Sequence, residues 1–146
     1  MAKKIFIDAN VILDLFESGR VFHEASVEVM KRLFSDARTE LFISSDMVSN
    51  IFYVLQNHYK YGFEKTLDAI EKITTMMRIC GVSQEDIRVS IEICKKGEFR
   101  DFEDALQYVC ALKEGCMLII TNNKKDFQNA SVEVLSTPEF LRLTER

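Results

Sequence analysis

A strand that ends in an acid and leads directly into a helix constrains the fold of this chain more than any other feature. The segment KKIFIDANVILDLF, from Lys3 to Phe16, begins with an apolar run that stops at Asp8 and then changes to helical spacing. This change of period predicts a strand over residues 5–8 and a helix from about Asn10 to Phe16. In open parallel α/β sheets, ligands bind beyond the carboxyl ends of the strands. Asp8 is therefore at a position where chemistry is expected.

The remainder of the chain alternates between short apolar runs and amphipathic helical stripes. This alternation predicts an α/β fold in which a parallel sheet carries helices on both faces. In one of the helices, Ile87, Ile91 and Cys94 share a face, and Ser45 is the expected N-cap of another. Further strands are expected at about 41–44, 76–82, 117–120 and 132–135, and further helices at about 23–34, 46–59, 63–75, 84–95, 102–113 and from residue 138 onward.

Length and composition limit the class of protein. A chain of 146 residues suggests one domain with a substantial core, and 47% hydrophobic with 29% charged residues is ordinary for a soluble protein. There is no run of 18 apolar residues and no signal-peptide pattern, so we expect no membrane span and a cytoplasmic location. The four cysteines form no C-x-x-C pair, and only two histidines are present, so we expect reduced thiols rather than a structural zinc site.

The net charge of −4 argues against a protein that holds nucleic acid by bulk charge alone. It does not exclude a nuclease, because acids that bind a metal lower the net charge. Basic residues still occur locally, at Lys95, Lys96 and Arg100 and again at Lys124 and Lys125.

Acids and amides gather at the predicted strand ends and at one helix start. Asp101 and Asp104 are three residues apart and share one helix face. The run 121–123, Thr-Asn-Asn, follows the strand at 117–120, and Asp126 comes shortly after it. If the first and fourth strands are neighbours, these groups meet Asp8 at one edge of the sheet. Hard cations such as Mg²⁺ prefer such oxygen ligands and can activate water for phosphodiester hydrolysis.

Simpler interpretations remain open for several of these acids. Asp101 and Asp104 also suit the positive end of a helix dipole, and Asp126 suits an ordinary turn. Asp14 is expected to be a solvent-exposed helix residue. Glycine-rich phosphate loops and the G-x-S-x-G nucleophile motif are absent. A phosphatase-type aspartyl nucleophile would need a second Asp where Asn10 stands.

Four segments together resemble the PIN domain: IFIDANVILDLF, SSDMVSNIFYVL, DFEDALQYVCA and LIITNNKKDF. The likeness covers nearly the whole chain and is greatest to small bacterial PIN proteins, including VapC-like toxin ribonucleases. It implies a single PIN domain over residues 1–146, with a three-layer fold whose twisted parallel sheet has about five strands. It also implies a ribonuclease that depends on Mg²⁺ or Mn²⁺.

The resemblance assigns roles to particular residues. It makes Asp8 and Asp104 metal-binding acids, with Asp101 close by on the same helix face. The family usually has a glutamate where this chain has Asn50, and Asn122 stands at the fourth acidic position, with Asp126 as the nearest carboxylate.

These departures leave the metal site with less negative charge than the family pattern, so the resemblance implies weakened activity. Asn50, Asp101, Asn122 and Asp126 would then position water or the outer ligands of the metal.

The resemblance also implies partners. The substrate would be RNA, with phosphates held by Lys95, Lys96, Arg100, Lys124 and Lys125. An antitoxin protein and a homodimer are expected. Two alternatives stay open: a PIN fold with a degraded site that binds RNA or protein without cutting, and another Mg²⁺-dependent phosphotransfer activity on an α/β sheet.

Overall fold

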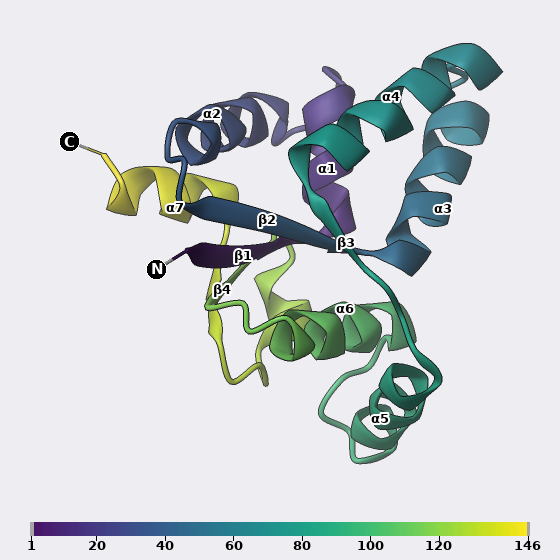
Figure 1. The fold of residues 1–146 in the computed structure, drawn as a ribbon, viewed down its shortest axis with the longest axis vertical. Helices are drawn as coiled ribbons and strands as arrows, with labels where there is room; N and C mark the ends of the chain where they lie inside the picture. The colour runs from purple at the N-terminus through teal and green to yellow at the C-terminus, as the bar shows by residue number, and fades with distance from the viewer. Residues whose placement is uncertain (1, 146) are drawn as a thin grey trace.

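A five-stranded parallel sheet with the order β3-β2-β1-β4-β5 forms the centre of the molecule (Figure 1). The computed structural model describes residues 2–145. The first strand lies in the middle, with β2 and β4 as its neighbours. The strands are β1 (Lys3–Ile7), β2 (Thr39–Ser44), β3 (Arg78–Cys80), β4 (Leu118–Ile120) and β5 (Glu133–Leu135).

Helices cover both faces of the sheet and make a three-layer α/β fold. On one side lie α1 (Ala9–Phe16), α2 (His23–Phe34), α3 (Ser45–Tyr53), α4 (Phe63–Met76) and α7 (Thr137–Leu143) (Figure 1). On the other side lie α5 (Gln84–Lys95) and α6 (Phe102–Lys113). Two short turns of helix complete the fold, the π-helix η1 (Val54–His58) after α3 and the 3₁₀ helix η2 (Lys124–Phe127) after β4.

The alternation of side chains along the strands explains why both faces need cover. In β1, Ile5 and Ile7 join the core beneath the larger group of helices, whereas Phe6 joins the core beneath α6. Strand β4 repeats the pattern, with Ile119 on the same side as Phe6. Because successive side chains point to opposite faces, an entirely apolar strand must be buried on both sides. The predicted α/β architecture of about five strands is confirmed.

Several element boundaries differ from the sequence expectations, and two of the differences adjoin β2 and β3. The strand expected over 76–82 is confined to Arg78–Cys80, because Met76 still belongs to α4. The helix that follows β2 begins one residue earlier than expected, with Ser44 as its N-cap. The Ser45 hydroxyl instead accepts a hydrogen bond from the Val82 backbone N–H at 3.0 Å, which links the ends of β2 and β3.

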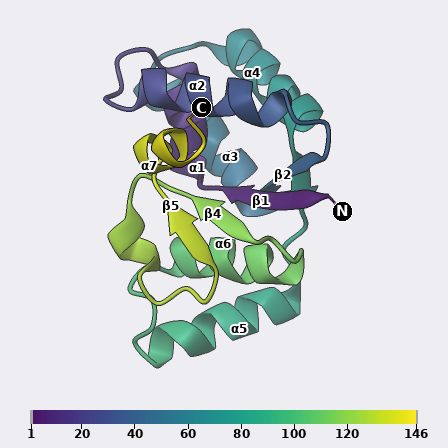
Figure 2. The ribbon, with the colours of Figure 1, turned by 90° about the vertical axis from the view of Figure 1, so that its left-hand side faces the viewer.

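Helix α5 lies outside α6 and packs on it rather than directly on the sheet (Figure 2). It therefore buries Asp86 and Ser90, while Ile87 and Ile91 on its apolar face stay 39% and 41% exposed. Asp86 forms a capping box with Ser83 and an ion pair with the Lys113 ammonium of α6. Burial alone would raise the pKa of Asp86, but these partners hold it below its ordinary value. The orientation of α5 thus follows its polar contacts, and of its apolar stripe only Cys94 packs partly against the core.

No helix within residues 2–145 is both long enough and apolar enough to cross a membrane.

Candidate active site

The site lies where the chain reverses its direction across the sheet. The strands after β1 are added on one side, up to β3, and β4 then returns to the other side of β1. Such a reversal opens a crevice between the carboxyl ends of the two central strands. Asp8 follows β1 and Thr121 follows β4, and the Thr121 hydroxyl donates to Asp8 Oδ2 at 2.7 Å. Strands β1 and β4 are paired, which meets the condition under which these groups gather at one edge of the sheet.

Asp8 is buried, and the protein fixes its carboxylate from several sides. It is the N-cap of α1 and accepts from the Asn10 backbone N–H at 3.4 Å. Gln107 Nε2 donates to Asp8 Oδ1 at 3.1 Å, while Gln107 Oε1 accepts from the Ala9 backbone N–H at 3.1 Å. The carboxylate is therefore held in one orientation before any ligand arrives.

Sequence reasoning missed Gln107. It is only 2% exposed, on a helix whose residues from Ala105 to Ala111 are all buried. The available signal was its place one helical turn after Asp104, as the single polar side chain in an apolar run.

A polar cleft of about 300 Å³ opens beside Asp8. Asp104 reaches it from the first turn of α6, which is capped by the Asp101 side chain. Asn50 lines it from α3 and Asp126 from η2, where the next residue, Phe127, is buried and anchors the turn in the core. The remaining lining residues are Ala9, Asn10, Met47, Asp101, Glu103 and Gln107.

Burial and neighbouring acids raise the pKa of two carboxylates in the cleft, Asp104 and Asp8. Burial, followed by the charges of Asp101, Asp8 and other acids nearby, raises the pKa of Asp104 to about 7. Burial also raises the pKa of Asp8, although the hydrogen bonds from Thr121 and Gln107 oppose that shift. No lysine or arginine among the described residues, 2–145, lines the cleft. The cleft is thus a cluster of hard oxygen atoms that lacks a counter-charge.

This donor set fits a hard divalent cation. Within residues 2–145 no three acid, histidine or cysteine side chains form a ready-made metal cage. Magnesium does not require one, because it is usually held by one or two carboxylates together with water and substrate phosphates. The carboxylates of Asp8 and Asp104, which face one cleft, meet that requirement.

Further acids, which sequence reasoning also missed, extend the cleft. Burial and the charges of Asp101 and Asp46 raise the pKa of Glu103. Asp46, in the first turn of α3, has one buried carboxylate oxygen, Oδ1, without a hydrogen-bond partner among residues 2–145. Glu103 directly precedes Asp104 in the sequence, but nothing in the spacing showed that the first turns of α3 and α6 would bring Asp46 near Glu103.

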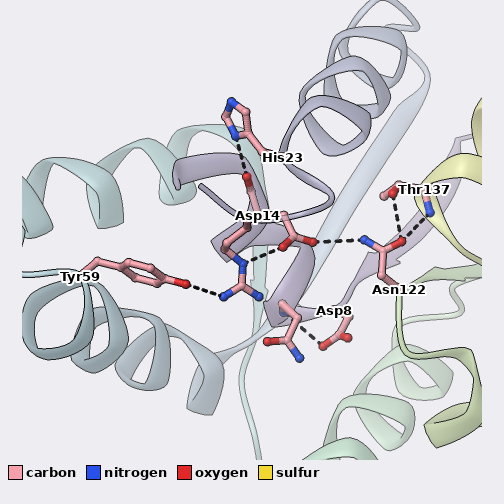
Figure 3. Close-up of polar contacts among 8 residues, drawn as sticks. Asp8, Asp14, His23, Tyr59, Asn122 and Thr137 are labelled. Atoms are coloured by element: carbon pink, nitrogen blue, oxygen red, sulfur yellow. Dashed lines mark hydrogen bonds and ion pairs between the residues drawn. The ribbon is translucent and has the colours of Figure 1, made fainter. Parts of the chain in front are cut away.

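Asn122 does not line the acidic cleft. Its Nδ2 donates to Asp14 Oδ2 at 3.1 Å, and its Oδ1 accepts from the Thr137 backbone N–H and hydroxyl, both at 2.9 Å (Figure 3). The side chain therefore joins α1 to the start of α7, and its oxygen already accepts two hydrogen bonds and is not free to bind a metal.

Asp14 is buried, contrary to the expectation that it is exposed to solvent. Arg20, in the loop after α1, returns over the helix and places its Nε 2.7 Å from Asp14 Oδ1. The Arg20 guanidinium also donates to the Tyr59 hydroxyl at 3.0 Å, and His23 Nδ1 lies 2.8 Å from the Asp14 carbonyl oxygen (Figure 3). The arginine supplies the charge that permits this carboxylate to be buried.

The predicted RNA-contacting cations are divided between different places. Arg100 and Lys125 line a hollow of about 110 Å³ that shares Asp101, Asp104 and Asp126 with the acidic cleft. Lys124 is paired with Glu139 of α7 at 2.9 Å. Lys95 and Lys96 are exposed at the end of α5 and line neither hollow.

Comparison with known proteins gives concordant matches. Residues 4–125 match the model of a PIN domain family. The chain is 37% identical over 140 residues to Ribonuclease VapC1 of Aquifex aeolicus, a match that covers 95% of this chain and 94% of that protein.

Solved structures with the same fold share less sequence. Mycobacterium tuberculosis VapC20, described as a sarcin-ricin loop cleaving toxin, aligns with a TM-score of 0.68 at 19% identity, over 88% of this chain and 95% of that one. A toxin–antitoxin complex from Klebsiella pneumoniae aligns with a TM-score of 0.65 at 19% identity, over 91% of this chain and 97% of that one. These two likenesses concern the fold.

Proposed function

The chain belongs to the PIN-domain family as a VapC-like member, and from that premise we propose that it is a divalent-metal-dependent endoribonuclease and the toxin of a toxin–antitoxin pair. The observation that carries the metal dependence is the acidic cleft at the carboxyl ends of β1 and β4. There Asp104 has a pKa of about 7 because it is partly buried among other acids without a cation. A bound Mg²⁺ or Mn²⁺ would neutralise these acids and polarise a phosphodiester and its attacking water.

Each residue of the cleft has a separate task in this proposal. Asp8 and Asp104 hold the metal, and Gln107 and Thr121 keep the Asp8 carboxylate oriented toward it. Asn50 offers a neutral oxygen or a donor to a water in the cleft. Asp101 keeps the first turn of α6 in place through its bond to the Asp104 backbone N–H, at 3.0 Å.

Asp126 adds charge to the rim of the cleft and raises the pKa of Asp8. Arg100 and Lys125 stand next to the acids and would hold the RNA phosphates that flank the scissile one. We propose that Lys124, Lys95 and Lys96, which line neither hollow, contact RNA phosphates farther from the cleavage site.

The partners follow from the family and the fold. We propose an antitoxin protein, because solved proteins of this fold include a toxin–antitoxin complex. A homodimer and a cytoplasmic location, where cellular RNA is available, complete the proposal.

A second candidate function rests on Asn50. An amide at that place lowers the charge of the metal site, which favours a PIN fold that binds RNA or protein without cutting it. An assay for cleavage separates the two.

Purified protein is expected to cleave RNA in the presence of Mn²⁺ or Mg²⁺ and to stop when EDTA removes the cation. Cleavage should rise between pH 6 and 8, because a proton on Asp104, whose pKa is about 7, competes with the metal. Gel analysis of structured and single-stranded RNA measures both effects. Binding of RNA without cleavage under all these conditions would favour the second candidate.

Asn50→Glu should tighten Mn²⁺ binding, by roughly tenfold, because it adds one anionic oxygen to the ligand set. Isothermal titration of the folded variant measures the affinity. Asn50→Gln has the same length without the charge and is the matched control, and Ser49→Glu places the charge on an exposed neighbour instead. Equal affinities for parent and Asn50→Glu would remove Asn50 from the metal site.

A further inference from the structure

A second hollow lies beside the acidic cleft, and we propose that it holds the base of an RNA nucleotide next to the phosphate that is cleaved. This hollow, the Arg20 pocket, has a volume of about 410 Å³. Its walls are the end of the loop that joins α1 to α2, with Arg20 and Phe22, and the turn after β4, with Asn122 and Asn123. Asn10 lines both the Arg20 pocket and the acidic cleft, so the two hollows adjoin at this residue. The inference rests on the proposed ribonuclease function.

Arg20 is braced so that part of its guanidinium remains available. Its Nε is bound to the buried carboxylate of Asp14, and one terminal nitrogen donates to the Tyr59 hydroxyl. The other terminal nitrogen has no partner among residues 2–145. An arginine whose plane is fixed by two contacts loses little freedom when its remaining N–H groups bind a ligand.

Two amides complete the polar lining. Asn122 is held in place by Asp14 and Thr137, so it serves as a fixed wall (Figure 3). The side-chain amides of Asn10 and Asn123 have no hydrogen bond within the described chain. A free carboxamide presents a donor and an acceptor side by side, and this pair matches the edge of a nucleobase.

Apolar groups lie next to these amides. Phe22 lines the Arg20 pocket, and Val21 beside it is 92% exposed. A flat base offers a face to such side chains while its edge meets the amides.

The charge of the Arg20 pocket distinguishes a base from a phosphate. Its one cation, Arg20, is already paired with its one anion, Asp14, at 2.7 Å. The lining is therefore close to neutral, whereas a phosphate subsite draws its binding energy from uncompensated cations. A neutral, planar ligand with a hydrogen-bonding edge fits better, and it would lie one step along the strand from a phosphate in the acidic cleft.

The test compares the preference for particular bases in RNA with the hydrolysis of a phosphodiester that carries no base. Asn123→Ala and Arg20→Lys are assayed with Mn²⁺ on a panel of short RNAs that differ at the nucleotides around the cleavage site. They are also assayed on bis(4-nitrophenyl) phosphate, which has no base. The preference of the parent for one base should fall roughly 5- to 150-fold in Asn123→Ala, the discrimination that one paired amide contact supplies. Hydrolysis of the base-free substrate should stay unchanged.

Controls separate the ways in which the proposal can fail. Asn57→Ala removes an exposed amide that lines neither hollow and should keep the preference of the parent. If the parent cuts RNA without preference, or if the variants retain its preference, the proposed base binding in the Arg20 pocket is wrong and the ribonuclease function still stands. An equal loss on every RNA, with a changed salt dependence, would indicate a backbone contact and would also overturn the proposed base binding. A parent that cuts no RNA would overturn the proposed function itself.

Discussion

Asp8→Asn is expected to lower RNA cleavage by about 1,000-fold or more, because a metal-stabilised transition state depends on several kcal/mol of charge interaction. The substitution removes one of the two anions that we assign to the metal. The second, Asp104, is partly protonated near neutral pH, since its pKa is about 7. One carboxylate in that state is insufficient to retain the cation.

The same substitution should leave the fold intact. Asparagine is as good an N-cap as aspartate, so the cap of α1 is preserved. The amide oxygen can still accept from Gln107 Nε2, and the Thr121 hydroxyl can turn to accept from the new amide nitrogen. The change therefore removes the charge and keeps most of the hydrogen bonds around this position.

Gel-based cleavage with Mn²⁺, beside thermal melts with and without the cation, measures these outcomes. Asp68→Asn, on the exposed face of α4, removes the same charge elsewhere and should cut RNA as the parent does. The parent should gain thermal stability from Mn²⁺, and Asp8→Asn should gain little. A variant that cuts at the rate of the parent would make Asp8 a structural residue.

The sequence predicted the position of Asp8 because two local signals coincide there. An apolar strand stops at the residue, and the spacing then changes to that of a helix. Both signals follow from the alternation of side chains along a strand and the periodicity of a helix, so they need no knowledge of distant contacts. The neighbouring strand, Leu118–Ile120, carries a similar signal, which is why Thr121 was placed at the same edge.

Residues whose roles depend on distant partners could not be predicted in this way. Asn122 follows the same strand, but it turns toward Asp14 and Thr137, and the sequence does not show that α7 starts beside it. Asp14 is the acidic residue of the short helix α1, and its position in the helix gives no sign that it is buried. Its burial is decided by Arg20, which arrives from a loop.

Helix α5 illustrates the same limit for packing. Its apolar stripe predicts an inward face with Ile87 and Ile91, yet it contacts α6 through Asp86 and the Lys113 ammonium. The spacing of apolar residues indicates that a helix is present, but it does not determine which face of the helix a neighbouring helix will cover. Asp8, Asp101, Asp104 and Asp126 were predicted to meet at one edge of the sheet, whereas Gln107, which orients Asp8, was found only in three dimensions.

Asp14→Ala is expected to lower the free energy of unfolding by about 2–3 kcal/mol. Removing one partner of a fully buried ion pair costs about 3–5 kcal/mol, and the value here should be lower because the Arg20 side chain is 25% exposed. The loss arises because Arg20 and the Asn122 amide both lose the acceptor that holds them. Urea unfolding followed by circular dichroism measures the difference.

A double-mutant cycle tests whether the ion pair is the cause. Arg20→Met in the Asp14→Ala background removes the stranded cation, so the double variant should lose less stability than the sum of the single changes. Asp14→Asn retains an acceptor for Arg20 and a similar shape, and it should lose less than Asp14→Ala. Additive losses would mean that Asp14 and Arg20 act independently. The loop that bears Arg20 would then be positioned by other contacts, and the arginine would have no fixed orientation toward a base in the pocket that it lines.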